Sequence, residues 1–167
     1  RSTQGVSSAA SDVYKRQSAL LLTRQGVKVL DQSMDETLDG VSKGGYAVLD
    51  CENPELVFLA TGSEVGLAMD VATSMTDKNI RVVSMPCWEI FETQSDEYKK
   101  LLIPDRGAMK ISMEAGITHG WEKYVGPDGA SLGLKSFGKS APYKKIYEHF
   151  NLTSNHIIKL TKNVLGK

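Results

Sequence analysis

The chemical pattern most easily recognised in the sequence is a glycine-containing stretch over residues 133–140. It reads Gly-Leu-Lys-Ser-Phe-Gly-Lys-Ser and satisfies G-x-x-x-x-G-K-[ST], the phosphate-cradling P-loop pattern. In P-loop proteins the sheet continues beyond the motif, and the acidic strand that holds magnesium usually follows it. Here the residues after Ser140 have almost entirely helical patterns, and Pro142 interrupts the helix start that should offer N–H groups to phosphate. We therefore expect a flexible turn without nucleotide binding, with Ser140 near the helix cap and Pro142 in the first helical turn.

Arg24 is a second candidate for binding an anion. It follows Ser18–Thr23, a short apolar run that we interpret as a strand. A cation just beyond the carboxyl end of a strand can meet a ligand, because open α/β sheets bind ligands outside those ends. From position alone, a solvated loop arginine is the commoner interpretation, so both remain open at this point.

The other reactive residue types form no recognisable site. Glu114 follows an expected strand, where a catalytic acid could sit, but no partner can be identified and a structural role is favoured. No metal-ligand spacing and no C-x-x-C pair is found among the histidines and cysteines, which are His119, His149, His156, Cys51 and Cys87. The sequence therefore predicts neither a metal site nor a disulfide framework.

The elements that would position these residues are organised around Leu56–Met85. Leu56–Ala60 is an apolar run without alternation, as expected for a strand covered on both faces of a parallel sheet. Ser63 is the expected N-cap of the following helix, and Glu64 would place negative charge near the positive end of the helix dipole. We consider anion binding at this helix start less favoured than capping, because Glu64 would repel an anion. Ile80–Met85 completes a βαβ unit. The apolar face of the helix consists of Val65, Ala68, Met69, Ala72 and Met75.

The rest of the chain supplies further strands and helices. Strands are expected at Tyr46–Asp50, flanking the Leu56 strand, and at Met109–Met113 and Ala130–Leu134. Helices are expected from Ser95 (with Tyr98, Leu101 and Leu102 inward), at Tyr143–Phe150 and at Ser154–Leu165. Asp31–Ser42 is interpreted as a connection that is either a short helix or an irregular linker, since Met34, Leu38 and Val41 have helical spacing. The segment holding Trp88, Ile90 and Phe91 is interpreted as an apolar turn. The fold class is therefore α/β, with three α/β/α layers around a mostly parallel, mixed sheet of about five strands.

Composition narrows the possible partners. The chain has 167 residues, 41% of them hydrophobic, and its 20 basic and 20 acidic residues cancel. These values suit one globular domain with a core and give no overall field for nucleic acid. No membrane span or signal peptide is apparent, so a cytoplasmic location is expected. Residues 1–17 are rich in Ser and Ala without periodicity, and we interpret them as a disordered leader, an artefact such as a foreign join left by gene assembly.

A resemblance adds what spacing alone does not. From Ser18 to about Leu165 the chain is similar to the C-terminal part of a transketolase, and the order of its motifs is more specific than any single one. The motifs are Thr23-Arg-Gln, Lys43-Gly-Gly-Tyr, Ala60-Thr-Gly-Ser-Glu-Val, Arg81-Val-Val-Ser-Met-Pro, Glu114-Ala-Gly, Lys123-Tyr-Val-Gly and Phe137-Gly-Lys-Ser-Ala-Pro. The third position of Phe-Gly-x-Ser-Ala-Pro varies in the family, so the resemblance implies that Lys139 completes the P-loop pattern by chance.

The resemblance also implies a function. A transketolase moves a two-carbon ketol unit between sugar phosphates, using thiamine diphosphate and Mg²⁺ or Ca²⁺ held between two subunits of a homodimer. The cofactor's diphosphate motif and its activating glutamate lie in the family's first two domains, so the present chain is expected to bind no cofactor and to be inactive alone. The implied division is 18–43 as the end of the pyrimidine-binding domain with its linker and 44–167 as the C-terminal domain.

Within this family the arginine of Ser/Thr-Arg-Gln contacts the sugar phosphate, and that position is Arg24 here. A guanidinium suits this task because it stays charged and can bind a phosphate through two parallel hydrogen bonds. No catalytic, cofactor-binding or metal-binding residue is expected in the chain, whose C-terminal domain would brace the second domain and add subunit contact.

Two alternatives remain from other classes. One is the last domain of another thiamine diphosphate enzyme, such as deoxyxylulose phosphate synthase or a 2-oxoacid dehydrogenase β subunit, although the Lys123 and Phe137 motifs argue against it. The other is a stand-alone α/β binding module, for which a well-behaved monomer that binds a nucleotide would be the supporting observation.

Overall fold

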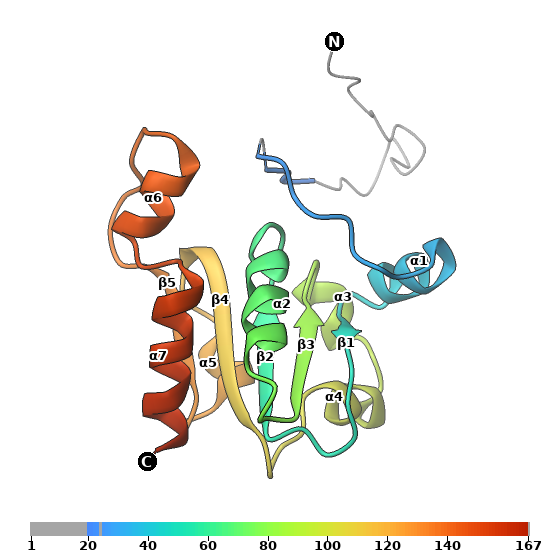
Figure 1. Cartoon of the computed structure of the whole chain (residues 1–167). Coiled ribbons are helices and arrows are strands. Elements are labelled where there is room, and N and C mark those ends of the chain that lie inside the picture. The colour runs from blue at the N-terminus through green and yellow to red at the C-terminus, as the bar shows by residue number, and fades with distance from the viewer. Residues whose placement is uncertain (1–19, 24, 167) are drawn as a thin grey trace, which may run out of the picture.

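The fold is a five-stranded mixed sheet with the strand order β1-β3-β2-β4-β5. The computed structural model describes residues 20–23 and 25–166 (Figure 1). β3, β2, β4 and β5 run parallel to one another, whereas β1, among the described strands, is antiparallel to its neighbour β3. The strands are β1 (Tyr46–Leu49), β2 (Leu56–Ala60), β3 (Ile80–Ser84), β4 (Met109–Ile117) and β5 (Ala130–Leu134). The expected three-layer α/β class with about five strands is confirmed.

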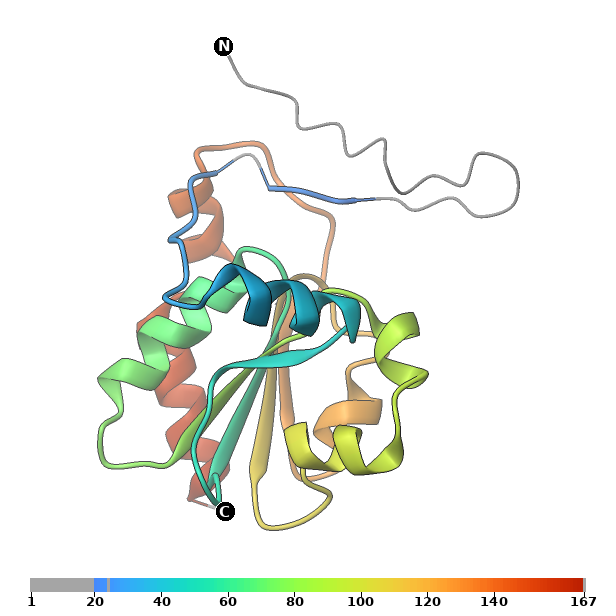
Figure 2. The same cartoon turned by 90° about the vertical axis from the view of Figure 1, so that its right-hand side faces the viewer.

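Helices cover both faces of this sheet, as the view along its edge in Figure 2 shows. α2 and α7 pack on one face, whereas α3, α4 and α5 pack on the other. α1 and α6 lie toward the carboxyl end of the parallel strands (Figure 1). The helices are α1 (Met34–Ser42), α2 (Glu64–Ser74), α3 (Trp88–Glu92), α4 (Asp96–Leu102), α5 (Glu122–Val125), α6 (Tyr143–His149) and α7 (Ser154–Leu165).

Alternate residues of the central strand supply both halves of the core. Phe58 packs toward α2 and α7, while Val57 and Leu59 pack toward α3 and α5, and all three side chains are fully buried. The buried aromatic side chains of α3 and of α5 with its N-cap residue, which we call the aromatic layer, are Phe91, Trp121 and Tyr124. This explains why β2 has no polar alternation: a strand covered on both faces exposes neither of them to water. The predicted apolar face of α2 is correct in four of its members, and Met69 is partly buried.

The position of β1 differs from the sequence prediction. It was expected to flank β2, but it pairs antiparallel with β3 at the edge of the sheet. Gly44, just before it, has a φ of 77° and lies so close to α3 that an added Cβ would be 2.4 Å from the carbonyl oxygen of Cys87. A glycine is therefore required there, and the resulting turn directs β1 along β3.

Of the two forms left open for the connection Asp31–Ser42, a short helix or an irregular linker, the structure shows the helix, α1. α1 begins with a complete capping box: the Ser33 side chain accepts from the N–H of Glu36, whose carboxylate accepts in return from the N–H of Ser33. This reciprocal pair satisfies two N–H groups that a helix start otherwise leaves free, so the connection is helical rather than irregular.

The predicted strand Ser18–Thr23 is not observed over its described part. Residues 20–23 have no regular secondary structure, and the side chains of Leu20, Leu21 and Leu22 are 70%, 91% and 80% exposed. A strand needs a neighbour to satisfy its backbone N–H and C=O groups, and these residues have none in the sheet. Ser18 and the expected leader 1–17 lie outside the described residues.

Three smaller predictions also need correction. The segment around Trp88 is helix α3 rather than a turn. In α4 the side chain of Leu102 is buried as expected, but that of Leu101 is 65% exposed. Pro142 is the N-cap of α6 rather than a residue of its first turn. The bounds of β2, β5 and α7 match those expected.

Candidate functional site

The carboxyl end of the sheet, between β2 and β4, is where this topology favours a site. The chain passes from β2 to β3 on one side and then crosses to β4 on the other, so the connections diverge between β2 and β4. Ligands of open α/β sheets bind at such a divergence. A hollow of about 290 Å³ lies there, and it is lined by Leu21, Leu22, Thr23, Thr61, Gly62, Ser63, Glu64, Glu114 and Ala115.

Glu64 is the buried charged residue of this hollow, with only 4% of its surface exposed. One carboxylate oxygen accepts hydrogen bonds from the Ser63 hydroxyl, at 2.9 Å, and from the Tyr147 hydroxyl. The other accepts from the backbone N–H of Ala115 at 3.0 Å. These three donors, together with the positive end of the α2 dipole, stabilise a carboxylate that is largely removed from water.

Ser63 does not act as the predicted helix cap. Its side chain makes no capping hydrogen bond to the first turn of α2, because its hydroxyl donates to Glu64 instead. Capping and anion binding were the two roles considered for this helix start, and the structure shows a third role. The residues around the α2 N-terminus are used to hold a buried carboxylate.

Tyr147 extends this arrangement to the N-terminal segment of the described chain. Its hydroxyl accepts a hydrogen bond of 2.9 Å from the side-chain amide of Gln25. Burial, followed by the hydrogen bond to Glu64, raises the pKa of Tyr147, so the phenol keeps its proton at neutral pH. A second contact comes from Lys28, whose ammonium group lies 2.6 Å from a carboxylate oxygen of Asp70 on α2.

Arg24, the predicted substrate-binding residue, lies outside the described residues. Its neighbours in sequence are described: Thr23 lines the hollow, and Gln25 is bonded to Tyr147. The residues that precede and follow Arg24 thus both lie at the carboxyl end of the sheet.

Glu114 has a structural partner. Its carboxylate accepts a hydrogen bond of 2.7 Å from the indole N–H of Trp121, a fully buried side chain of the aromatic layer. The structural interpretation of Glu114 accordingly has a physical basis, since an indole N–H removed from water needs an acceptor.

The P-loop pattern does not form a phosphate cradle. Gly133 and Leu134 still belong to β5, and residues 135–142 continue without a helix, with exposed side chains. The helix that follows, α6, begins only at Tyr143. A P-loop requires a helix that begins directly after its lysine, so the sequence pattern here lacks its structural context.

No metal site is found among residues 20–23 and 25–166: no group of three or more His, Cys, Asp or Glu side chains could hold an ion. Cys51 and Cys87 are free. In the same part of the chain no helix is long and apolar enough to cross a membrane.

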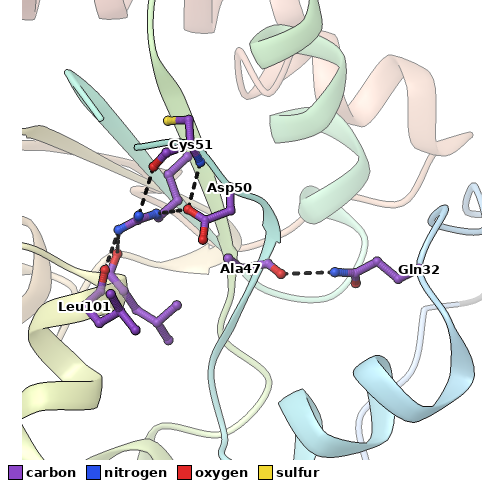
Figure 3. Close-up of polar contacts among 7 residues, drawn as sticks. Gln32, Ala47, Asp50, Cys51 and Leu101 are labelled. Atoms are coloured by element: carbon purple, nitrogen blue, oxygen red, sulfur yellow. Dashed lines mark hydrogen bonds and ion pairs between the residues drawn. The ribbon is translucent and has the colours of Figure 1, made fainter. Parts of the chain in front are cut away.

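Sequence reasoning missed Arg81, a buried arginine on β3. Its guanidinium donates to the Asp50 carboxylate at 2.6 Å, to the Cys51 carbonyl at 3.1 Å, and to the carbonyls of Leu101 and Leu102 at the end of α4. Figure 3 shows Asp50, Cys51 and Leu101 around this group, with Gln32 donating separately to the carbonyl of Ala47. Arg81 therefore joins β3 to the end of β1 and to α4, and a charged residue inside an apolar strand was the only sequence signal for it.

Comparison with known proteins identifies the family. Residues 44–153 match the profile of the transketolase-like TK C-terminal domain. The chain belongs to this family. It is 42% identical over 143 residues to a transketolase of Aquifex aeolicus, a match that covers 84% of this chain and 21% of that protein. A chloroplastic transketolase of Solanum tuberosum is 38% identical over 167 residues, covering 97% of this chain and 22% of its own length.

The solved structures agree. A Pichia stipitis transketolase described as a complex with sedoheptulose 7-phosphate superposes with a TM-score of 0.70 at 34% identity, over 77% of this chain and 19% of that one. The transketolase resemblance of the sequence is thus confirmed. The chain spans about one fifth of the length of the relatives it matches.

Proposed function

We propose that this chain is the C-terminal part of a transketolase, which transfers a two-carbon ketol unit from a ketose phosphate to an aldose phosphate. The observation that carries the proposal is the similarity to transketolases over nearly the whole chain, together with the small share of their length that it spans. The sugar phosphate named for the Pichia stipitis structure supports this substrate class.

We assign 18–43 to the end of the preceding, pyrimidine-binding domain and 44–167 to the C-terminal domain. Support comes from the family match, which begins at residue 44, and from the exposed apolar side chains before it. Leu21 and Val29 are 91% and 97% exposed, an arrangement typical of a segment that packs on something else. In the parent protein, residues 20–23 would gain the neighbouring strands that they lack here.

Arg24 is assigned the role of binding the phosphate of the substrate. It follows directly after Ser18–Thr23, which we expect to be a strand in the parent, and a guanidinium pairs with phosphate through two charge-assisted hydrogen bonds. This contact would fix the distal end of the sugar phosphate and so orient its reacting carbon atoms.

Thiamine diphosphate and its Mg²⁺ or Ca²⁺ would be held by the preceding domains in a homodimer of the parent. The described residues do not fit this cofactor, since they offer no group of side chains for its metal. Because the family's diphosphate motif and activating glutamate lie in the preceding domains, we give no residue of this chain a catalytic role and propose that the domain 44–167 supports the second domain and the subunit contact. A cytoplasmic location remains a prediction, and the relative from Solanum tuberosum is named chloroplastic.

The experiment that tests this function compares the parent protein with the 167-residue chain. With thiamine diphosphate, xylulose 5-phosphate and ribose 5-phosphate, the parent should transfer the ketol unit, and the chain alone should not. Turnover by the chain alone would contradict the assignment of all catalytic groups to other domains.

In the parent, Arg24→Ala should raise KM for xylulose 5-phosphate by roughly 10- to 100-fold, which corresponds to the loss of about 1.5–3 kcal/mol from hydrogen bonds to a charged group. Arg106→Ala is the matched control, because Arg106 is exposed and lies just before β4, at the opposite end of the sheet. An unchanged KM in Arg24→Ala would show that Arg24 is a solvated loop residue.

A further inference from the structure

We propose that Tyr147 and Glu64 are positioning residues of the substrate site: they hold Gln25, and thereby fix the segment that presents Arg24. This inference rests on the proposed function of Arg24. The supporting contacts join segments far apart in sequence, because Gln25 and Tyr147 are separated by 122 residues and Tyr147 and Glu64 by 83.

The side chains of Gln25, Tyr147 and Glu64 form a relay of two hydrogen bonds. The direction of both bonds is determined by the carboxylate of Glu64 at one end. An ionised carboxylate only accepts, so the single proton of the Tyr147 hydroxyl is directed to Glu64. The lone pairs of that hydroxyl then require a donor, and the amide nitrogen of Gln25 supplies it at 2.9 Å. A reversed Gln25 amide would place its oxygen against an oxygen without a free proton, so the relay selects one orientation of Gln25.

The base of the relay is rigid. Glu64 is 4% exposed, lies in the first turn of α2, and accepts a hydrogen bond from the backbone of Ala115 in β4. Both α2 and β4 contribute to the main core on one face of the sheet. A buried carboxylate whose donors come from packed elements has few alternative positions, because each displacement would leave it unpaired away from water.

Two further contacts restrict the same segment. Lys28 forms an ion pair of 2.6 Å with Asp70 on α2, and Leu30 packs against the core. Both side chains of the ion pair are largely exposed, at 73% and 48%, so it contributes little compared with the relay. The hydrogen bond from Gln25 to Tyr147 is therefore the most specific contact between the C-terminal domain and the segment next to Arg24.

The functional consequence concerns geometry rather than chemistry. A misplacement of about 1 Å in a substrate-binding group can cost orders of magnitude in rate, so a guanidinium benefits from a fixed backbone. Tyr147 and Glu64 touch neither substrate nor cofactor in this proposal, and their effect is exerted through Gln25.

The test uses Tyr147→Phe in the parent transketolase, since this change removes one hydroxyl and keeps the ring. We expect KM for xylulose 5-phosphate to rise about three- to tenfold, the loss of one hydrogen bond, with kcat within about twofold. KM for an unphosphorylated ketol donor should stay unchanged, which a general structural defect would not allow. Tyr143→Phe is the control, because Tyr143 lies on the same helix and is 45% exposed.

Gln25→Ala provides a second, independent variant outside the core. It should raise the same KM, and the double variant Gln25→Ala/Tyr147→Phe should be no worse than either single variant, because both remove the same contact.

The outcomes separate the two proposals. If Arg24→Ala raises KM for the phosphorylated donor but neither Tyr147→Phe nor Gln25→Ala does, the positioning role is wrong and the proposed function stands. Additive effects in the double variant would also overturn the relay. If Arg24→Ala itself has no effect, the role of Arg24 fails, and the inference fails with it.

Discussion

Replacing Arg81 with methionine should lower the stability of the chain substantially. The arginine side chain is only 7% exposed, and its guanidinium donates to one carboxylate and three backbone carbonyls. Methionine can fill the volume of the arginine stem but offers no donor, so these acceptors would lose their partners in a site that water reaches only in part.

The magnitude is set mainly by the carbonyl acceptors. The Asp50 side chain is 62% exposed and can be solvated once Arg81 is gone, so the ion pair contributes little by itself. The hydrogen bonds to the carbonyls of Cys51 and Leu102 lie at 3.1 and 3.3 Å, and bonds from a charged donor contribute about 1.5–3 kcal/mol each. Allowing for partial access of water, we expect a loss of roughly 2–4 kcal/mol, a large part of the 5–15 kcal/mol typical of a domain.

Urea unfolding of the 167-residue chain, followed by circular dichroism, measures this loss. The midpoint should fall in Arg81→Met while the slope m stays constant, since the surface exposed on unfolding hardly changes. Arg106→Met is the control, because Arg106 is exposed and should change the free energy of unfolding by less than about 0.5 kcal/mol. A loss below about 1 kcal/mol in Arg81→Met would refute the view that Arg81 joins three elements.

Two further predictions concern aromatic burial and acid stability. Phe91 is 1% exposed and Phe137 is 97% exposed, so Phe91→Ala should cost about 3–5 kcal/mol of unfolding free energy and Phe137→Ala less than about 0.5 kcal/mol, both measured by urea titration. Equal effects would contradict the assigned core. Lys123, 2.7 Å from Glu92, lowers the pKa of that glutamate below its ordinary value of 4.5, so the stabilisation is complete above pH 4.5 and is lost as the pH falls through the lower folded-state pKa. Lys123→Met should remove this part of the acid dependence in a pH series of unfolding midpoints, and an unchanged acid dependence would exclude the pair as its cause.

The elements read correctly from the sequence are those with a strong local signal. The unbroken apolar run at Leu56–Ala60 and the helical periodicity over Ser154–Leu165 gave the observed bounds of β2 and α7. In both cases local propensity and burial favour the same secondary structure, so tertiary contacts do not change what the local sequence predicts. The capping box at Ser33 was an equally local signal for α1, and it was available in the sequence as Ser-x-x-Glu.

The elements read incorrectly depend on partners that spacing does not specify. An apolar run such as Ser18–Thr23 indicates a strand, but it becomes one only beside a neighbour, and its described part, residues 20–23, pairs with no strand of the sheet. The antiparallel pairing of β1 with β3 likewise depends on the turn at Gly44 and its close contact with α3. Propensity describes what a segment can form, whereas pairing depends on the rest of the fold.

The candidate site was only partly accessible from sequence for the same reason. The Thr-Arg-Gln motif indicated Arg24, but nothing in the spacing linked Gln25 to Tyr147 or Tyr147 to Glu64. Glu64 was predicted as a charge at a helix start, and its burial between Ser63, Tyr147 and Ala115 became visible only in three dimensions. The contacts that support a positioning role for Tyr147 and Glu64 therefore join segments that lie far apart in the sequence.

The most direct test of the central proposal, that this chain is the C-terminal part of a transketolase, is to determine the coding sequence upstream of the Ser18 codon in the source DNA. We predict an in-frame region that encodes a Gly-Asp-Gly diphosphate motif followed by a thiamine-binding domain. A start codon directly upstream, with neither motif nor domain, would contradict the proposal and would favour a stand-alone α/β binding module.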